Sequence, residues 1–201
     1  MANEQKIWNK LIGAGLTPAG AAGLMGNLRA ESNLEPTNLQ NTYERKLGLS
    51  DATYTASVDS GKYTNFVSDA AGYGLAQWTY SARKKALLAY AKAQGKSIGN
   101  LEMQVDFALQ ELRESYPAVW KILITTASVR AASDVVLLQY ERPADTSERV
   151  RTLRAGFGEA YFEQLSAADE PETPPMPEQP KTRTGTLELD GKFYAVAVTE
   201  I

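Results

Sequence analysis

The stretch that decides the fold is Leu24-Met25-Gly26-Asn27-Leu28-Arg29-Ala30-Glu31-Ser32-Asn33-Leu34-Glu35-Pro36. Upstream of it, Thr17-Pro18 has the form of a helix start, with a hydroxyl N-cap followed by proline in the first turn, where the missing N–H costs nothing. Downstream, Asn33 and Pro36 are typical of a helix end. We therefore expect a helix that begins near residue 18 and ends close to Glu31.

Glu31 is the unusual residue of this helix. Leu24, Leu28 and Glu31 lie at i, i+4 and i+7, so the acid shares a helix face with two leucines. Burial and the negative end of the helix dipole both disfavour its ionised form. A carboxyl that stays protonated is what the general acid of a glycosidase requires. A solvated glutamate at a frayed helix end explains the stretch equally well, and the residues alone leave both interpretations open.

Composition limits the chemistry of the chain. Its 201 residues can form one good core with a small appendage, and its net charge of −3 gives no support for a nucleic-acid partner. It contains no Cys and no His. This excludes a Cys/His peptidase, a Ser-His-Asp hydrolase and disulfides, and leaves a classical zinc site without its usual ligands. We expect carboxylate chemistry with no metal and no cofactor.

No targeting or membrane segment is recognisable. The N-terminal Met-Ala-Asn-Glu-Gln-Lys leads directly into an amphipathic segment, and no apolar run approaches the ~20 residues that span a bilayer. We expect no membrane span, and export, if it occurs, by a route other than a signal peptide.

Helical spacing of apolar residues predicts a mainly α-helical domain over residues 1–168. Helices are expected at residues 4–13, 18–31, 81–94, 101–114, 117–125, 129–140 and 148–165, with Ser128 and Ser147 as N-caps. Residues 36–72 are expected to form an irregular, tyrosine-rich insertion with short helices and room for one hairpin. Its tyrosines suit stacking on sugar rings, although packing of the loop is the commoner role for any one of them.

The composition changes near residue 169. Residues 169–183 are rich in proline and acidic residues and are expected to form a stiff, solvated linker. Residues 184–201 alternate apolar and polar side chains around Asp190-Gly191, which predicts a β-hairpin, as a tail or as the start of a small module. Because two strands are marginal alone, we expect it to pack on the main domain, another copy or a neighbouring protein.

Three blocks together resemble the phage tail lysozyme family, in order and over roughly residues 5–165. They are residues 26–36, Asp69-Ala70-Ala71-Gly72-Tyr73-Gly74-Leu75-Ala76-Gln77-Trp78, and Tyr140-Glu141-Arg142-Pro143. More distantly, the Glu-Ser pair followed by Gly-Leu-Ala-Gln resembles goose-type lysozymes and soluble lytic transglycosylases. The family occurs in phage tail proteins, endolysins and prophage-derived proteins, so the resemblance implies a location in the virion or tail, or release from the host cytoplasm, and action on the bacterial cell wall.

The resemblance implies a lysozyme-like, mainly helical fold and a muramidase that cleaves the β-1,4 bond from N-acetylmuramic acid to N-acetylglucosamine in peptidoglycan. Glu31 matches the catalytic acid, and Asp69 lies where goose-type lysozymes often carry an aspartate that positions water. Thr79 stands where a second aspartate follows in that group. The resemblance assigns substrate binding to Tyr73, Gln77, Trp78, Thr79 and Tyr140.

Two other functions stay open at this point. A lytic transglycosylase needs only one carboxylate, because a hydroxyl of the substrate attacks in place of water, and it gives anhydro-muropeptides. A non-catalytic module could bind cell-wall glycan as part of a phage tail or larger assembly, joined through the C-terminal tail. A general protein–protein interaction domain would leave the three blocks unexplained.

Overall fold

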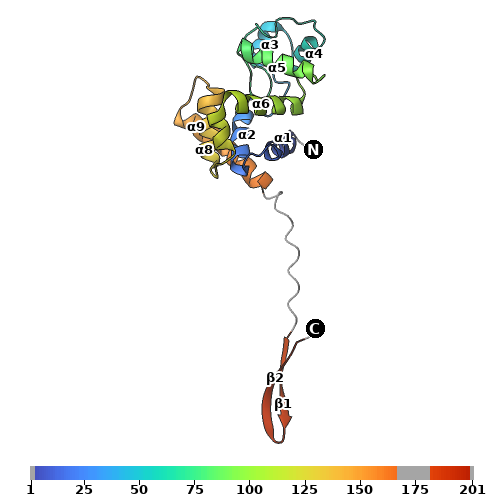
Figure 1. Ribbon diagram of the computed structural model, residues 1–201, viewed down its shortest axis with the longest axis vertical. Helices are drawn as coiled ribbons and strands as arrows, with labels where there is room; N and C mark the ends of the chain where they lie inside the picture. Colours follow the sequence, from blue (N-terminus) through green and yellow to red (C-terminus); the bar gives the residue numbers. More distant parts are fainter. Residues whose placement is uncertain (1–2, 167–181, 200–201) are drawn as a thin grey trace. The chain divides into compact units, whose positions relative to one another are not determined.

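The computed structural model describes residues 3–166 and 182–199 of this chain. Two compact units, Met1–Asp169 and Glu170–Ile201, are considered separately. The first is helical and the second is a β-hairpin (Figure 1), so the predicted mainly α class is confirmed. The predicted linker falls outside the described residues over 169–181, and its last two residues belong to the first strand of the hairpin.

The helical unit follows the predicted order of elements. Its members are α1 (Asn3–Gly13), α2 (Pro18–Ser32), α3 (Asn41–Leu47), α4 (Asp51–Asp59), α5 (Ser81–Ala93), α6 (Leu101–Ser115), α7 (Pro117–Leu123), α8 (Val129–Val135), the π-helix η1 (Val136–Glu141) and α9 (Glu148–Ser166). The predicted helix limits are correct to within two residues, except for the helix expected over 129–140.

Helix α2 lies among the other helices and packs against α1, α7, α8, η1 and α9 (Figure 1). Every residue from 19 to 28 is buried, so this part of α2 has no solvated face. Glycines and alanines fill much of this stretch, and their small side chains let the neighbouring backbones come close. Glu31 follows this buried stretch, in the last turn of the central helix, where its side chain is partly exposed.

The close packing of α2 on α9 makes Gly26 a sensitive position. A Cβ atom at Gly26 would overlap the carbonyl oxygen of Arg154 and lie 2.7 Å from the backbone nitrogen of Gly158. We expect Gly26→Ala to lower the free energy of unfolding by about 1–3 kcal/mol, as overpacking of a core usually does, measured by urea denaturation. Gly156→Ala is the control, because nothing lies within 4 Å of its added methyl group. Equal effects of the two substitutions would contradict the packing argument.

Two predicted helix caps are confirmed. The Gly20 N–H donates to the Thr17 hydroxyl oxygen at 2.9 Å, and the Ala131 N–H donates to the Ser128 hydroxyl oxygen at 3.2 Å. At the other end of α2, Asn33 has a left-handed backbone with φ of 54°. The side-chain caps and this left-handed residue are local features, which is why the sequence predicts them well.

The insertion over residues 36–72 contains the short helices α3 and α4, as expected. The hairpin allowed for in this segment is wrong, because these residues, all of which the structure describes, contain no strand. Their ladder-type pairing is limited to an isolated bridge between Leu39 and Tyr73. That bridge holds the insertion against the glycine-rich segment that follows it.

The helix predicted over 129–140 changes type at Val136. Helix α8 ends at Val135 and continues as η1, whose last residue is Glu141. Arg142 then adopts a left-handed backbone with φ of 52°, and its N–H donates to the Leu137 carbonyl oxygen at 2.8 Å. A π-turn keeps the apolar pattern of a helix, which is why the sequence does not reveal it. Such turns are rare and often occur at functional sites.

The C-terminal unit is the predicted hairpin. Strands β1 (Thr182–Leu189) and β2 (Lys192–Thr199) pair antiparallel, with Leu189 opposite Lys192. Asp190 and Gly191 form the turn and both have positive φ, 49° and 73°, as a type I′ turn requires. Large hydrophobic side chains are exposed on this unit at Leu187, Leu189 and Phe193.

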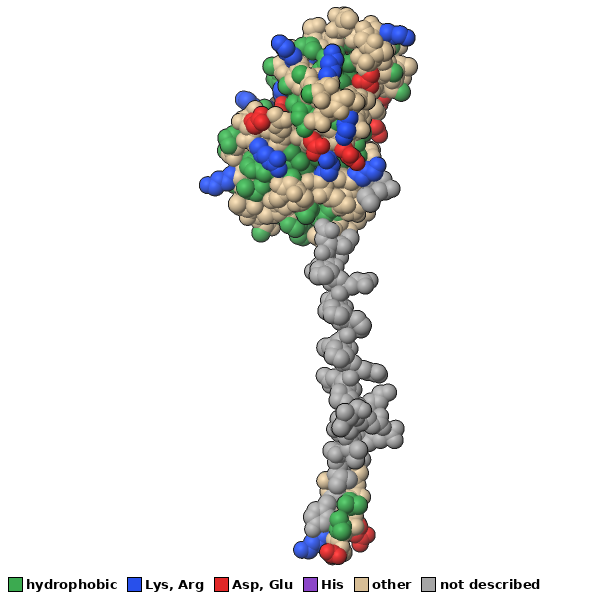
Figure 2. Space-filling model, turned by 45° about the vertical axis from the view of Figure 1, so that its right-hand side comes forward, with side chains coloured by type: hydrophobic (Ala, Val, Ile, Leu, Met, Phe, Trp, Pro, Cys, Tyr) green, Lys and Arg blue, Asp and Glu red, His purple; other side chains and the backbone are tan. Residues whose placement is uncertain are grey.

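Charges are interspersed on the surface of the helical unit. On the face drawn in Figure 2, basic and acidic side chains alternate with apolar ones and do not gather into a patch of one sign. Within residues 3–166 and 182–199, no helix combines the length and the apolar character that crossing a membrane requires.

Candidate active site

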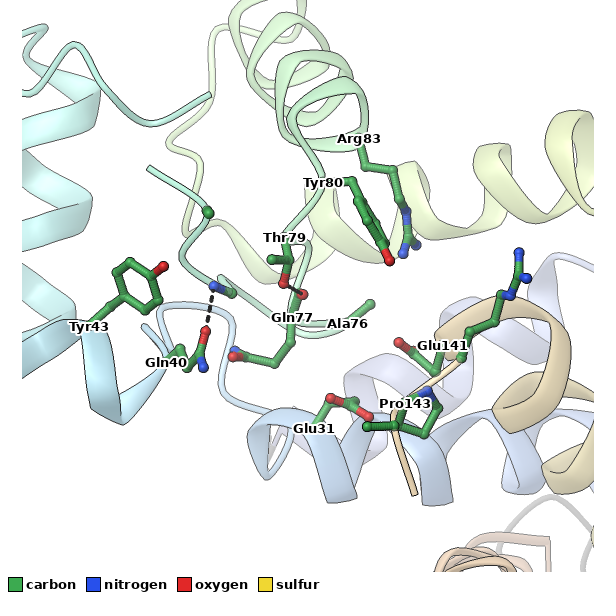
Figure 3. Close-up of a pocket in the computed structure, with 14 residues that line it drawn as sticks. Glu31, Gln40, Tyr43, Ala76, Gln77, Thr79, Tyr80, Arg83, Glu141 and Pro143 are labelled. Atoms are coloured by element: carbon green, nitrogen blue, oxygen red, sulfur yellow. Dashed lines mark hydrogen bonds between the residues drawn. The ribbon is translucent and has the colours of Figure 1, made fainter. Parts of the chain in front are cut away.

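A cavity of about 710 Å³ opens beside the C-terminal end of α2 (Figure 3). Its walls come from four parts of the chain: the end of α2, the start of the insertion, the segment from residue 70 to the first turn of α5, and the end of η1. The lining residues are Glu31, Gln40, Tyr43, Ala70, Gly72, Ala76, Gln77, Thr79, Tyr80, Arg83, Glu141, Arg142, Pro143 and Ala144. All three sequence blocks of the resemblance therefore contribute to one cavity.

Glu31 lies in the last turn of α2 and reaches this cavity. Leu24 and Leu28 on the same face are buried, as expected, while the Glu31 side chain stays 19% exposed. An Arg154 guanidinium nitrogen lies 2.6 Å from Glu31 Oε1, and the Arg154 side chain is 9% exposed. The sequence analysis predicted partial burial of Glu31 at the end of a helix. It did not predict the positive charge of Arg154 beside the carboxyl group.

One sequence signal points to Arg154. It lies at i, i+4, i+7 and i+11 with the buried residues Gly158, Tyr161 and Leu165, so it belongs to the inward stripe of α9. A buried arginine requires an anion or several hydrogen-bond acceptors. Arg154 has both, because it also donates to the Asn27 side-chain oxygen at 3.3 Å.

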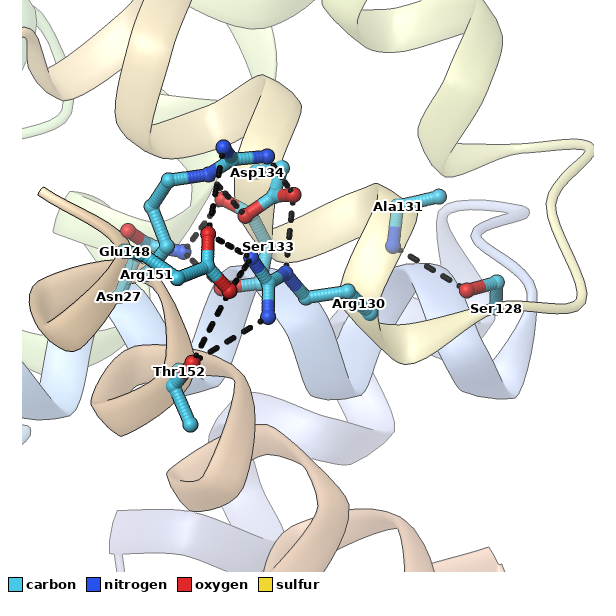
Figure 4. Close-up of polar contacts among 9 residues, drawn as sticks. All are labelled: Asn27, Ser128, Arg130, Ala131, Ser133, Asp134, Glu148, Arg151 and Thr152. Atoms are coloured by element: carbon cyan, nitrogen blue, oxygen red, sulfur yellow. Dashed lines mark hydrogen bonds and ion pairs between the residues drawn. The ribbon is translucent and has the colours of Figure 1, made fainter. Parts of the chain in front are cut away.

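Ion pairs hold α9 in the position that Arg154 needs. Asp134 on α8 accepts hydrogen bonds from Arg151 on α9 and from Arg130, and Arg130 also contacts both carboxylate oxygens of Glu148 (Figure 4). Arg151 precedes Arg154 by one helical turn. The cluster therefore fixes the same face of α9 that carries the Glu31 partner.

Glu141 is the second carboxyl group of the cavity. Figure 3 shows Glu31 and Glu141 on neighbouring walls, with both side chains directed into the same space. Glu141 Oε1 is buried and, among the described residues, has no hydrogen-bond partner. Burial raises the pKa of Glu141 well above its usual range, and the charge of Glu31 raises it further, while Arg83 and Arg154 oppose the shift. The sequence analysis treated Glu141 as part of a motif and named no role for it.

Asp69 does not line the cavity, in contrast to the expected water-positioning role. Its side chain is 4% exposed. Asp69 Oδ2 accepts hydrogen bonds from the Tyr54 and Tyr63 hydroxyls at 2.6 and 3.1 Å. Asp69 Oδ1 accepts from Lys84 Nζ at 2.5 Å and from the Ala71 N–H at 2.9 Å. Both oxygens are thus engaged, and the bond to Ala71 is the Asx turn that a glycine-rich loop favours.

Three aromatic residues expected to bind substrate, Tyr73, Trp78 and Tyr140, are buried and do not line the main cavity. The Tyr73 hydroxyl pairs with the Thr55 hydroxyl at 2.6 Å. The Trp78 indole N–H and the Tyr140 hydroxyl both donate to Glu111 Oε2 at 2.9 Å. Tyr73 and Trp78 are core residues, and Tyr140 lines an adjoining cavity of about 440 Å³ that shares residues with the first.

Gln77 and Thr79 are the expected substrate-binding residues that do line the main cavity. Gln77 has a positive φ of 43°, and its side-chain nitrogen donates to the Asn38 side-chain oxygen at 2.8 Å. The Thr79 hydroxyl donates to the Gln77 carbonyl oxygen at 2.8 Å. The short loop between them is therefore held by its own hydrogen bonds, with both side chains at the cavity wall.

The sequence analysis expected tyrosines of the insertion near sugar but did not single out Tyr80 or Arg83 on the rim of the cavity. Arg83 lines the cavity and forms a two-pronged ion pair with Glu111, at 2.7 and 2.8 Å. Tyr80 beside it is 75% exposed, and Tyr43 from the insertion lies across the cavity (Figure 3). Exposed aromatic rings with arginines provide the stacking and hydrogen-bonding surfaces that sugars use. In the described part of the chain, no group of three Asp or Glu side chains is placed to hold a metal ion.

Comparison with known proteins identifies the family of this chain. The profile of the phage tail lysozyme family matches residues 2–165, and the chain belongs to that family. A curated relative, morphogenesis protein 1 of Bacillus phage B103, is 25% identical over 171 residues, which cover 82% of this chain. The match covers 39% of the relative, so the chain spans about two fifths of that protein's length.

Proposed function

We propose that this chain is a muramidase that cleaves the β-1,4 bond from N-acetylmuramic acid to N-acetylglucosamine in peptidoglycan. The observation that carries the proposal is the position of Glu31. The residue that matches the catalytic acid of the family lies at the wall of a cavity of about 710 Å³, between a buried leucine face and an arginine. An open cavity whose rim carries the exposed Tyr80 and the partly buried Tyr43 suits a glycan strand.

In the proposed mechanism, Glu31 protonates the glycosidic oxygen while the bond to the sugar breaks through an oxocarbenium-like transition state. Arg154 fixes the orientation of the carboxyl group by its contact at 2.6 Å. Gln77 and Thr79 offer polar groups to the sugar, and Tyr43 and Tyr80 offer flat apolar faces.

In this proposal Asp69 holds the loop in place and does not position a water molecule. Its bonds to Tyr54, Tyr63 and Lys84 attach the start of the segment that leads to Gln77 and Thr79. We assign it a positioning role, because neither of its oxygens is free to orient a water molecule in the cavity.

The engagement of Asp69 favours a second candidate, a lytic transglycosylase. That reaction uses one catalytic carboxyl as acid and then as base, while the substrate supplies the attacking hydroxyl. It therefore requires no carboxylate at the Asp69 or Thr79 position.

Mass spectrometry of the fragments released from purified peptidoglycan tests the proposal. Muropeptides with a reducing end from the wild type and none from Glu31→Gln would support the muramidase. Anhydro-muropeptides would support the transglycosylase instead. Release of glycan fragments at an unchanged rate by Glu31→Gln would refute the role of Glu31. Binding of glycan without any release from either protein would indicate a binding module.

We further propose a phage tail or larger cell-wall-acting assembly as the setting. The C-terminal unit presents exposed Leu187, Leu189 and Phe193 on a two-stranded hairpin, which suits attachment to another protein. Sedimentation of the full chain and of a chain that ends at residue 168 would show whether the hairpin drives self-association.

A further inference from the structure

Glu141 presents a buried acceptor that the proposed mechanism does not use. Its Oε1 atom is excluded from solvent and has no hydrogen-bond partner among the described residues. Its side chain lines the same cavity as Glu31 (Figure 3). It ends a π-helical segment, which sets its direction differently from that of a regular α-helix.

Three arginines lie at or beside the cavity, and among the described residues one direct ion pair joins them to the two carboxyl groups, since Arg142 lines the cavity without an ion pair to either glutamate. Arg154 on α9 pairs directly with Glu31, whereas Arg83 on α5 is engaged in two hydrogen bonds with Glu111 on α6. Two ionised glutamates would therefore share one directly paired cation. An ionised carboxylate with an oxygen that is buried away from any donor is strongly disfavoured. A single retained proton removes this cost and leaves one negative charge opposite Arg154.

We propose that Glu141 is a second active-site carboxyl, which shares one proton with Glu31 and thereby keeps Glu31 supplied for proton transfer at neutral pH. The inference rests on the proposed function. Two carboxyl groups at one site release their protons in two separated steps, because the second ionisation creates like charges side by side. The burial that raises the pKa of Glu141 acts in the same direction.

The proton that the reaction consumes is supplied by the Glu31–Glu141 pair and is later returned to it. The shared proton passes through Glu31 to the glycosidic oxygen as its bond to the sugar carbon breaks. In the hydrolase, the water oxygen bonds to that carbon and the proton released from water returns to the pair. No other reactant is needed. Glu141 acts through Glu31 and is therefore a positioning residue.

The test is the pH dependence of peptidoglycan cleavage by Glu141→Gln. In the variant, Glu31 beside Arg154 is the one carboxyl left to hold the proton. We expect the alkaline limb of kcat/KM to move down by one to two pH units, which corresponds to about 10–100-fold lower activity at neutral pH. Acidification is expected to restore the activity, and KM is expected to stay unchanged. Glu141→Asp, which keeps a carboxyl group, is expected to move the limb less.

Glu163→Gln provides the control, since it makes the same change at an exposed position on α9. An unshifted pH limb in Glu141→Gln, or a loss that acidification does not restore, would overturn the proposal. A loss at every pH as complete as that of Glu31→Gln would overturn it too, because Glu141 would then donate the proton itself.

A measurement without substrate separates this inference from the proposed function. A group with a raised pKa in the folded state stabilises the fold at low pH, and this stabilisation is lost as pH rises from the unfolded value of about 4.5 toward the folded value. The folding equilibrium constant of the wild type is expected to fall by up to about tenfold per pH unit in this range relative to that of Glu141→Gln. Parallel pH profiles of stability would contradict the retained proton, even in a protein that cleaves peptidoglycan.

Discussion

Glu31→Gln is expected to lower the rate of peptidoglycan cleavage by about 10²–10⁴-fold, the usual contribution of a positioned general acid or base. The amide has nearly the same shape as the carboxyl group, and its oxygen can still accept the hydrogen bond from Arg154. We therefore expect the free energy of unfolding to fall by about 1–3 kcal/mol, because the buried Arg154 keeps a hydrogen-bond acceptor but loses its anion. Initial rates from the turbidity of a cell-wall suspension, together with urea denaturation, measure the two effects.

Glu35→Gln is the matched control for this prediction. Glu35 lies four residues further along, is exposed, and accepts a hydrogen bond from the Thr37 hydroxyl outside the cavity. The control is expected to keep wild-type activity. A similar loss in both variants would mean that net charge, and not a proton from Glu31, governs the rate.

Lys84→Met is expected to produce the largest loss of stability, about 3–5 kcal/mol, the typical result of removing one partner of a buried ion pair. Lys84 is 0% exposed, and its ammonium group lies 2.5 Å from Asp69 Oδ1 and 2.8 Å from the Ala71 carbonyl oxygen. Methionine fills the same space but leaves the Asp69 charge buried without a cation. Urea denaturation measures the loss.

Two further variants test the cause of this loss. Lys85→Met makes the same change at the next, exposed position and is expected to leave stability within about 0.5 kcal/mol of the wild type. Adding Asp69→Asn to Lys84→Met removes the stranded charge and is expected to recover part of the lost stability. If the double variant were less stable than Lys84→Met, the buried charge would not be the reason for the loss.

Local patterns in the sequence predicted the elements that depend on neighbouring residues. The Thr17 and Ser128 caps and the Asp190-Gly191 turn are all decided within four residues of chain, and all are confirmed. The side of the helix on which Glu31 lies could also be predicted, because the period of a single helix aligns it with Leu24 and Leu28. Such features can be read from one segment at a time.

The features that were missed depend on residues far apart in the sequence. Asp69 carries no local mark that distinguishes a cavity-facing carboxylate from one enclosed by Tyr54, Tyr63 and Lys84. Likewise, nothing near Glu31 indicates Arg154, because their contact depends on how α9 packs against α2. The roles of Tyr73, Trp78 and Tyr140 were ambiguous for a similar reason, since a buried core and a sugar-binding surface both favour aromatic side chains.

The contact between Arg154 and Glu31 also has a consequence for synthesis of the protein on the ribosome. Glu31, the proposed catalytic acid, leaves the exit tunnel early, whereas its counter-ion Arg154 is in the last helix of the unit. Pairings of such large sequence separation form late in folding, because a long chain segment must be closed before they contribute stability. A nascent chain that has not yet released α9 therefore lacks the assembled site, which delays any lytic activity until translation of the helical unit is complete.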